Sequence, residues 1–310
     1  QAVLTNAEEL MGLRLGQDGY AFAEIRAVPE LDQEAKTAAI TFFVDPRNRV
    51  YVRRINFNGA DNVNDEVFRR EMRQMEGGYL SNRDIDRSKL SLQQLPYVEK
   101  VEHETTPVPG SPDLVDVDFQ IEEGLPGQFG GSLGYSETYG ITLGGNFIHS
   151  NFLGTGRRVA MELRGGEYQK VYDINFTDPY RNIDGVSRTL SLTYQDITQY
   201  TSSTSDFGTT TLSGGMNWSY PVGNFQRLTL GFSYQDSELV TSTYSSRQAL
   251  AWVAQNGEPF PAPGGLIGTK VQSLDAITAW TFDSRNAALF PTNGTRLTAG
   301  KVAAMRRAVG

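Results

Sequence analysis

The sequence predicts an α+β repeat of order β-α-α-β-β, followed by an all-β antiparallel transmembrane β-barrel that is incomplete, with about nine strands. Charge is the first indication, because residues 1–123 hold 23 acidic and 14 basic side chains, whereas residues 124–310 hold 13 and 14. Composition is the second indication, because the second segment carries 25 of the 32 Gly and 23 of the 33 aromatic residues. A charged, water-soluble part that joins a Gly-rich and aromatic-rich part near Glu123 is the simplest account.

Alternation of apolar with polar or small residues is the third indication. It is clear between Gln128 and Arg164, where Ile141, Leu143 and Phe147 form one apolar series and Val159, Met161 and Leu163 form the next. Runs of about nine to eleven residues with period two, separated by turns, are typical of strands that cross a bilayer as a barrel. No stretch approaches the 18 consecutive apolar residues of a transmembrane helix.

The first 45 residues have the order helix, strand, strand. Helical spacing covers residues 2–16 and ends at the glycines 16 and 19, and strands are expected at 20–28 and 38–45. We interpret residues 1–45 as the C-terminal part of an α+β unit whose first strand and helix are missing.

Residues 46–124 carry a complete copy of the same unit. A strand is expected at 50–57, and Asn64 is expected to cap a helix that runs to Glu76. Ser81 caps a second predicted helix that ends at Leu95, before a proline. Two strands, 98–106 and 114–123, complete the β-α-α-β-β order.

Residues 125–310 are expected to form the N-terminal portion of the barrel. Strands are predicted at about 128–136, 140–150, 157–166, 169–178, 186–198, 207–220, 225–238, 270–282 and 294–302. Short connections alternate with longer ones, such as the Ser-, Pro- and Gly-rich stretch between Glu238 and Thr269, so the soluble part is expected at the short-turn, periplasmic end. Residues 301–310 do not have the pattern of a closing strand.

Catalytic and metal-binding patterns are missing from the sequence. His103 and His149 lie in different predicted domains, and there is no Cys to complete a metal site. No GxSxG elbow occurs, and the glycine pairs at 130–131 and 144–145 lack the GK[ST] of a phosphate loop. Asp116 and Asp118 alternate with apolar residues, which indicates the outer face of a strand. We expect no enzyme activity, no cofactor, no metal and no nucleic-acid partner.

A resemblance to a known family rests on four segments that fall in the family's order. They read YVRRINFNGADNVNDEVFRREMRQMEGGYLS from Tyr51, VPGSPDLVDVDFQIEE from Val108, NFLGTGRRVAMELRGGEYQKVYDINFTDPYRNIDGVS from Asn151 and FPTNGTRL from Phe290. With these segments the chain resembles the BamA family, which assembles β-barrel proteins in the Gram-negative outer membrane, within the superfamily that joins POTRA domains to a barrel. On this resemblance the chain is truncated at both ends.

The resemblance implies a function, a location and partners. Residues 1–45 and 46–124 would be POTRA domains in the periplasm, the second adjacent to the barrel, and residues 125–310 would lie in the outer membrane. Unfolded outer-membrane proteins would be the clients, a BamD-like lipoprotein and other accessory lipoproteins the partners, and outer-membrane lipids the surroundings. The family's lipoprotein contact matches Glu76, with Arg69 and Arg70 as further candidates.

The family's lateral gate, at which the first barrel strand unpairs and templates a client strand, matches a Gly-rich segment here. Its residues are Gln128, Phe129, Gly130, Gly131, Ser132, Leu133, Gly134 and Tyr135, and the edge extends to Ser136. These glycines also fit positions that curve a barrel.

Alternatives remain open for the function and for the lipoprotein contact. A polypeptide-secretion transporter of the same superfamily is one alternative, and a passive porin is another, although porins need no periplasmic repeats. From charge alone, the helix face around Glu76 is an ordinary solvated surface.

Overall fold

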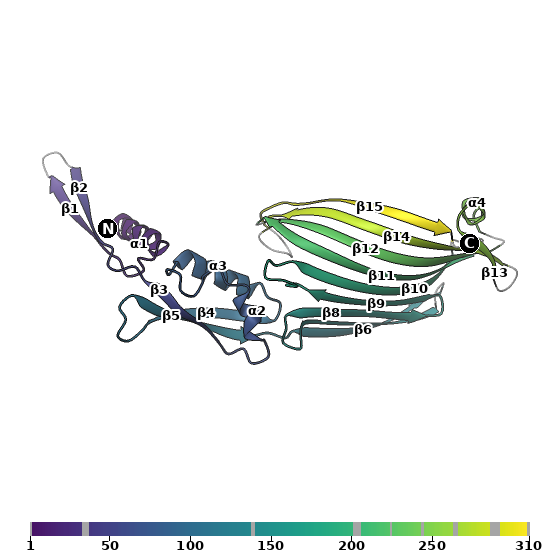
Figure 1. Cartoon of the computed structure of the whole chain (residues 1–310), viewed down its shortest axis with the longest axis horizontal. Coiled ribbons are helices and arrows are strands. Elements are labelled where there is room, and N and C mark those ends of the chain that lie inside the picture. Colours follow the sequence, from purple (N-terminus) through teal and green to yellow (C-terminus); the bar gives the residue numbers. More distant parts are fainter. Residues whose placement is uncertain are drawn as a thin grey trace. The chain divides into compact units, whose positions relative to one another are not determined.

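The structure is a computed structural model that describes residues 2–32, 37–137, 140–200, 206–223, 225–242, 245–262, 266–285 and 292–308. The chain divides into two compact units, 1–126 and 127–310. Figure 1 shows helices and a small sheet in the first unit and one large curved sheet in the second. Each unit is described by itself.

The first unit begins with the predicted order of helix, strand and strand. Helix α1 covers Ala2–Gly16, and strands β1 (Glu24–Asp32) and β2 (Thr37–Asp45) pair antiparallel. Strand β1 starts four residues later than predicted, because the chain first turns at Gly19, which has φ +97°, and Tyr20 N–H donates to the Leu15 carbonyl.

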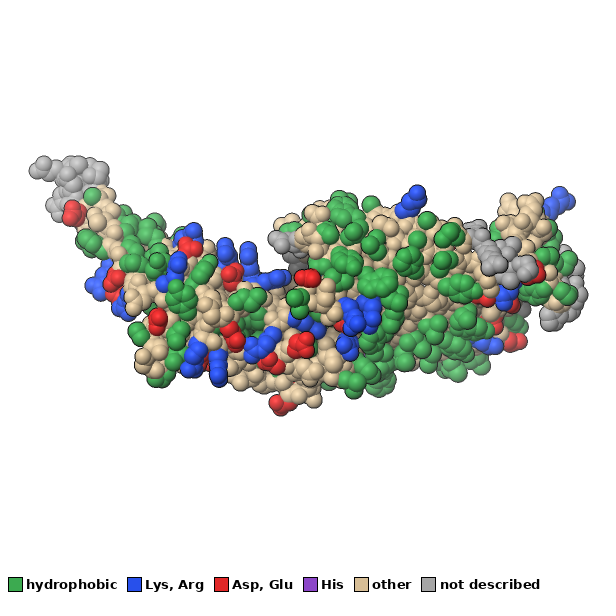
Figure 2. Space-filling model, in the orientation of Figure 1, with side chains coloured by type: hydrophobic (Ala, Val, Ile, Leu, Met, Phe, Trp, Pro, Cys, Tyr) green, Lys and Arg blue, Asp and Glu red, His purple; other side chains and the backbone are tan. Residues whose placement is uncertain are grey.

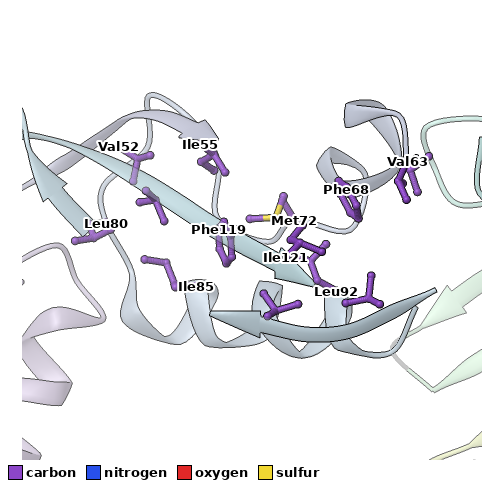
Figure 3. Close-up of a cluster of buried hydrophobic side chains, with 14 of the residues drawn as sticks. Val52, Ile55, Val63, Phe68, Met72, Leu80, Ile85, Leu92, Phe119 and Ile121 are labelled. Atoms are coloured by element: carbon purple, nitrogen blue, oxygen red, sulfur yellow. The ribbon is translucent and has the colours of Figure 1, made fainter. Parts of the chain in front are cut away.

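The second part of this unit has the predicted β-α-α-β-β order. Strand β3 (Tyr51–Asn58) lies parallel to β5 (Leu114–Glu123), and β4 (Val98–Pro107) pairs antiparallel with the other side of β5. Helices α2 (Asp65–Arg69) and α3 (Asn82–Gln93) supply the apolar side chains that face the sheet. Figure 3 shows these side chains converging on Phe119, which is 0% exposed.

The predicted helix from Asn64 to Glu76 is wrong in length. Helix α2 ends at Arg69, and the side chain of Asn64 makes no capping hydrogen bond. Beyond it the chain turns toward α3, where the Ser88 hydroxyl accepts from the N–H of Arg73 at 2.8 Å and of Gln74 at 3.2 Å. Because those N–H groups bond to a side chain of another element, they are not used in a continued helix. Ser81 caps α3 as predicted, accepting from the Asp84 N–H.

In the described residues, the second unit is a single antiparallel sheet of ten strands that is not closed. Neighbouring strands along the sheet follow one another in sequence, apart from β13 and β15, which both pair with the same side of β14. The strands are β6 (Gly127–Ser136), β7 (Gly140–Phe152), β8 (Arg157–Gly166), β9 (Gln169–Asp178), β10 (Ser187–Tyr200), β11 (Asp206–Gly223), β12 (Gln226–Thr241), β13 (Glu258–Ala262), β14 (Leu266–Asp283) and β15 (Arg296–Ala308).

All nine predicted strands are present, and one expectation about their surroundings is wrong. The long connection before β14 is not a simple loop, because it contains helix α4 (Arg247–Gln255), capped by Ser246, and the short strand β13. Residues 301–308 continue strand β15, whose backbone pairs with β14 as far as Ala308. The first two residues of the FPTNGTRL segment, Phe290 and Pro291, lie outside the described residues.

Strand register gives the sheet one apolar and one polar face. Successive partners in the central row of the first face are Phe129, Phe147, Met161, Ile174, Leu192, Gly214, Tyr234, Leu274 and Met305. The row beside it on the other face reads Gly130, Asn146, Glu162, Asp173, Thr193, Ser213, Gln235 and Ser273. In Figure 2, hydrophobic side chains gather over the sheet, and Lys, Arg, Asp and Glu are dense on the first unit.

No helix among the described residues is long and apolar enough to span a bilayer.

The two faces predict opposite tolerances to charge. Leu192→Arg is expected to destabilise the sheet in a bilayer by about 2–4 kcal/mol, because the guanidinium would face the hydrocarbon. Ser191→Arg is expected to cost much less, because the neighbouring position faces the polar side. Urea titration of the lipid-embedded protein, followed by heat-modifiable mobility on gels, measures both. Equal losses would contradict this assignment of the faces.

Candidate functional site

Strand β6 forms one edge of the large sheet. Within the described residues it pairs only with β7, so one side of its backbone has no strand partner. The apolar side chains Phe129, Leu133 and Tyr135 are all more than 70% exposed. A free row of N–H and C=O groups beside exposed apolar side chains is a template for a further strand.

Glycine reduces the side-chain contact between β6 and β7. Six of the ten register pairs contain a glycine, and Gly131 faces Gly145 directly. Two of the glycines also have a packing role, because a Cβ at Gly130 would lie 2.4 Å from the Asn146 amide oxygen and one at Gly134 would lie 2.8 Å from the Thr142 hydroxyl. Cross-strand side-chain pairs stabilise a sheet, so the β6–β7 pair is held mainly by its backbone hydrogen bonds.

The edge strand β3 of the first unit is covered, in contrast with β6. Backbone groups of residues 77–80 run along it: Val52 N–H donates to the Gly78 carbonyl at 2.9 Å, Gly77 N–H donates to the Val52 carbonyl at 2.7 Å, and Leu80 N–H donates to the Val50 carbonyl at 2.8 Å. This segment replaces a neighbouring strand at the first half of β3.

Side-chain ions complete the cover at Ile55. A Glu76 carboxylate oxygen accepts from the Ile55 N–H at 2.8 Å, and Arg69 Nη2 donates to the Ile55 carbonyl at 3.1 Å. The two ions also contact each other, with Arg69 Nη1 3.1 Å from Glu76 Oε1. Glu76 and Arg69 therefore occupy the hydrogen-bonding positions that a strand would use at this residue. We call these two side chains the ionic cap of β3.

Further contacts hold Arg69 in the ionic cap. Its guanidinium pairs with Asp65 and lies over the Phe57 ring, 5.6 Å from the ring centre. The hydrogen bond from the Ile55 N–H, together with the Arg69 guanidinium, holds the pKa of Glu76 below its ordinary value. Glu76 is therefore ionised at neutral pH, and its carboxylate is used in contacts within the chain.

The predicted site residues are brought together only in part. Arg69 and Glu76 touch, whereas Arg70 is half-buried at the end of α2, where its backbone N–H donates to the Glu66 carbonyl. The expectation that Glu76 lies at an exposed helix end is wrong, because it follows turns after α2 and bonds to β3. A lipoprotein contact at these residues stays a prediction, as does the gate at Gln128–Tyr135.

The ionic cap was not foreseen from the sequence, because Ile55 and Glu76 lie 21 residues apart and only the folded chain joins them. One signal was available: a short sheet needs its edge covered, and the Arg69 and Glu76 pair is near in sequence to the strand's end.

In the part of the chain that the structure describes, no group of three His, Cys, Asp or Glu side chains converges to form a possible metal site. His103 lies beside the Phe119 ring, with ring centres 6.0 Å apart, and burial lowers its pKa. Such a histidine is neutral at pH 7, and its exposed ring packs against Phe119 from the solvent side of β4.

Comparisons with known families match both units. The family model described as "Omp85 superfamily domain" matches residues 151–304, and the POTRA model, "Surface antigen variable number repeat", matches residues 50–124. Together with the structure, these matches confirm the predicted fold class of a POTRA repeat followed by an antiparallel membrane-type sheet.

Individual relatives agree with these models. The chain is 28% identical, over 91% of its length, to the outer membrane protein assembly factor BamA of Neisseria meningitidis, and it covers 35% of that protein. A crystal structure of BamA from Haemophilus ducreyi lacking POTRA domains 1–3 is 27% identical, with a TM-score of 0.77 over 98% of this chain and 57% of that one. CdiB from Acinetobacter baumannii, at 11% identity and a TM-score of 0.50 over 98% of this chain and 54% of that one, shares the fold alone. The chain spans about a third of the length of the curated relatives that it matches.

The ionic cap predicts that the stability of the first unit depends on pH. Glu76→Gln is expected to lower the free energy of unfolding of the first unit by about 1 kcal/mol at pH 7, because a half-exposed charged acceptor becomes a neutral one. The native pKa of Glu76 lies below the unfolded value, so its contribution is present above the unfolded pKa and is lost as pH falls through the native one. Urea unfolding at pH 7 and below about pH 4 tests this, since the two proteins should converge at low pH.

A control for this prediction is Glu102→Gln, because Glu102 pairs only with the exposed side chain of Lys100. Its effect at pH 7 should be near zero. An effect as large as that of Glu76→Gln would mean that the cover of Ile55 adds no stability.

Proposed function

On the premise that this chain belongs to the Omp85 superfamily and carries its POTRA repeat, we propose that it acts in the assembly of β-barrel proteins in the outer membrane. The observation that supports the proposal is the Gly-rich pairing of β6, an edge strand among the described residues that directly follows the POTRA repeat in the chain. The protein works by binding and templating, without a catalytic residue, a cofactor or a nucleotide.

The proposed mechanism uses β6 as a lateral gate. A client segment pairs with the free backbone edge from Gln128 to Ser136, and each added hydrogen bond orders the next client residue. Glycine-rich pairing with β7 lets this edge adjust at small cost, because few side-chain contacts change when the strand bends. The apolar face of the sheet contacts lipid, so a client strand that adds to β6 has its own apolar face directed into the bilayer.

The proposed domain assignment follows from the same premise. Residues 1–45 are the C-terminal part of one POTRA domain, residues 46–124 are the POTRA domain adjacent to the barrel, and residues 125–310 are the N-terminal portion of the barrel. The POTRA part lies in the periplasm and the sheet lies in the outer membrane.

An accessory lipoprotein is proposed to dock near the ionic cap, at Glu76 with Arg69 and Arg70. Glu76 is about 42% exposed at its side chain, so one carboxylate oxygen can accept from a basic partner group while the other keeps the Ile55 N–H. On this account charge reversal at Glu76 acts twice, by repelling the partner and by uncovering β3.

Assembly is favoured over secretion by the comparisons. The match to a BamA structure has a TM-score of 0.77 at 27% identity, whereas the match to CdiB has 0.50 at 11% and carries only the fold.

The gate is tested by site-specific photo-cross-linking to a client during assembly. A benzophenone amino acid at Gly131 is expected to capture client chains, because a side chain there meets no atom nearer than 3.8 Å and projects from the edge strand. Leu212 is the matched control, since it lies in the same row and on the same face but within an interior strand. Adducts should form from residue 131 and stay at background from residue 212. Equal capture at both positions, or at neither, would contradict templating at β6.

A further inference from the structure

The short connections at one end of the sheet present large apolar side chains to solvent. The connection between β7 and β8 holds Leu153, which is 79% exposed, and the connection between β9 and β10 holds Ile183, which is 98% exposed. Both lie at the end of the sheet where β6 begins. Large apolar side chains with this exposure are available to contact another surface.

Well-defined turns hold these side chains outward. Leu153 has φ +55°, a left-handed conformation that is unfavourable for a branched side chain, while Asn151 fixes the turn by accepting from the Gly156 N–H at 2.8 Å. In the other turn, Arg181 N–H donates to the Val186 carbonyl at 2.8 Å, and Asn182 Oδ1 accepts from the Val186 N–H at 3.0 Å. A strained backbone that exposes a leucine points to a function for that leucine.

Two arginines flank one buried aspartate beside these turns. Arg157 Nε lies 3.5 Å from a carboxylate oxygen of Asp178, and Arg188 faces Asp178 across the β9–β10 pair. The aspartate is 3% exposed. Arg188 is half-buried, and its Nε has no hydrogen-bond partner among the described residues. The row therefore carries a net charge of +1 and a buried donor that lacks an acceptor.

The arginine row lies on the apolar face of the sheet. Trp218 is the register partner of Arg188 on β11, and the next pair on the same face is Phe176 with Leu190. Toward this end of the strands, the side chains on this face thus change from apolar residues to arginines. The turns with the exposed Leu153 and Ile183 follow beyond the arginines. This order matches the order of acyl chain and phosphate in a lipid leaflet.

We propose that Arg157 and Arg188 form a binding site for the phosphate of an anionic phospholipid at this end of the apolar face, with the turns that carry Leu153 and Ile183 beyond the headgroups. The proposal rests on the proposed function, because it needs the apolar face to contact lipid. Each guanidinium offers paired N–H donors that suit phosphate oxygens. Asp178 pairs with Arg157 and leaves one positive charge for the lipid.

The chemistry favours a lipid over a protein partner. The arginine row continues directly from the apolar face, and its charge excess matches a single anionic headgroup. The turn between β9 and β10 adds no net charge, because it holds one basic residue, Arg181, and one acidic residue, Asp184. The site would anchor this side of the sheet at the headgroups of one leaflet.

Trp218 provides a direct test, because it is adjacent to the site. The protein, with Trp252→Phe and Trp280→Phe so that Trp218 alone fluoresces, is folded into phosphatidylethanolamine bilayers that contain brominated phosphatidylglycerol or brominated phosphatidylethanolamine. Quenching reports which headgroup is enriched. We expect a preference of about fivefold for phosphatidylglycerol, which falls to near one in Arg157→Gln/Arg188→Gln.

Matched variants separate a site from general charge and from misfolding. Arg158→Gln/Arg227→Gln removes two positive charges from the same end of the sheet but from its opposite face, and should keep the preference. Arg157→Lys/Arg188→Lys retains the charges beside Asp178 and should keep most of the preference for phosphatidylglycerol.

Any of four results would overturn the lipid site. One is an equal preference in all variants, and another is an equal loss in the opposite-face pair. The third is an unchanged lipid preference together with loss of lipoprotein capture, which would assign the arginines to a protein contact. Absence of quenching by either brominated lipid would show that Trp218 does not face lipid, and it would overturn the proposed function as well.

Discussion

The backbone groups at strand edges are the constraint on which both units depend. Each edge strand has N–H and C=O groups that need a partner, and an unpaired edge recruits another chain. The first unit covers β3 with residues 77–80 and with the ions of Glu76 and Arg69, while its other edge, β4, carries charged side chains such as Glu99 and Lys100. Among the described residues, the second unit leaves both of its outer strands, β6 and β15, open on one side.

This contrast connects the fold to the proposed activity. In a protein that templates strands, an uncovered β3 would compete with β6 for the same extended segments. The ionic cap is therefore as relevant to assembly as β6 itself. Glu76 has two roles on this view: its hydrogen bond to Ile55 protects the edge, and its half-exposed carboxylate is available to an accessory protein.

Period-two alternation and turn residues were sufficient to predict the nine long strands of the second unit. Glycines that end a helix were sufficient to predict where α1 ends. The sequence could not show where long-range hydrogen bonds replace local ones. Helix α2 does not continue past Arg69, because the N–H groups of Arg73 and Gln74 donate to the hydroxyl of Ser88 on another helix. Glu76 likewise accepts from a strand residue that lies 21 positions earlier. Similarly, Arg157, Asp178 and Arg188 become neighbours only through strand register. Strand β13 was missed because it contains two prolines, and helix α4 was missed because it is a short helix within a connection rich in Ser, Pro and Gly.

Hydrogen exchange of the β6 amides, measured by mass spectrometry on the bilayer-embedded protein, tests the central claim most directly. The open-edge account predicts that amides of residues 128–136 exchange faster than those of the interior strand β10, and that a client strand peptide slows them selectively. Slow exchange in β6 without client, or fast exchange that the client leaves unchanged, would contradict it.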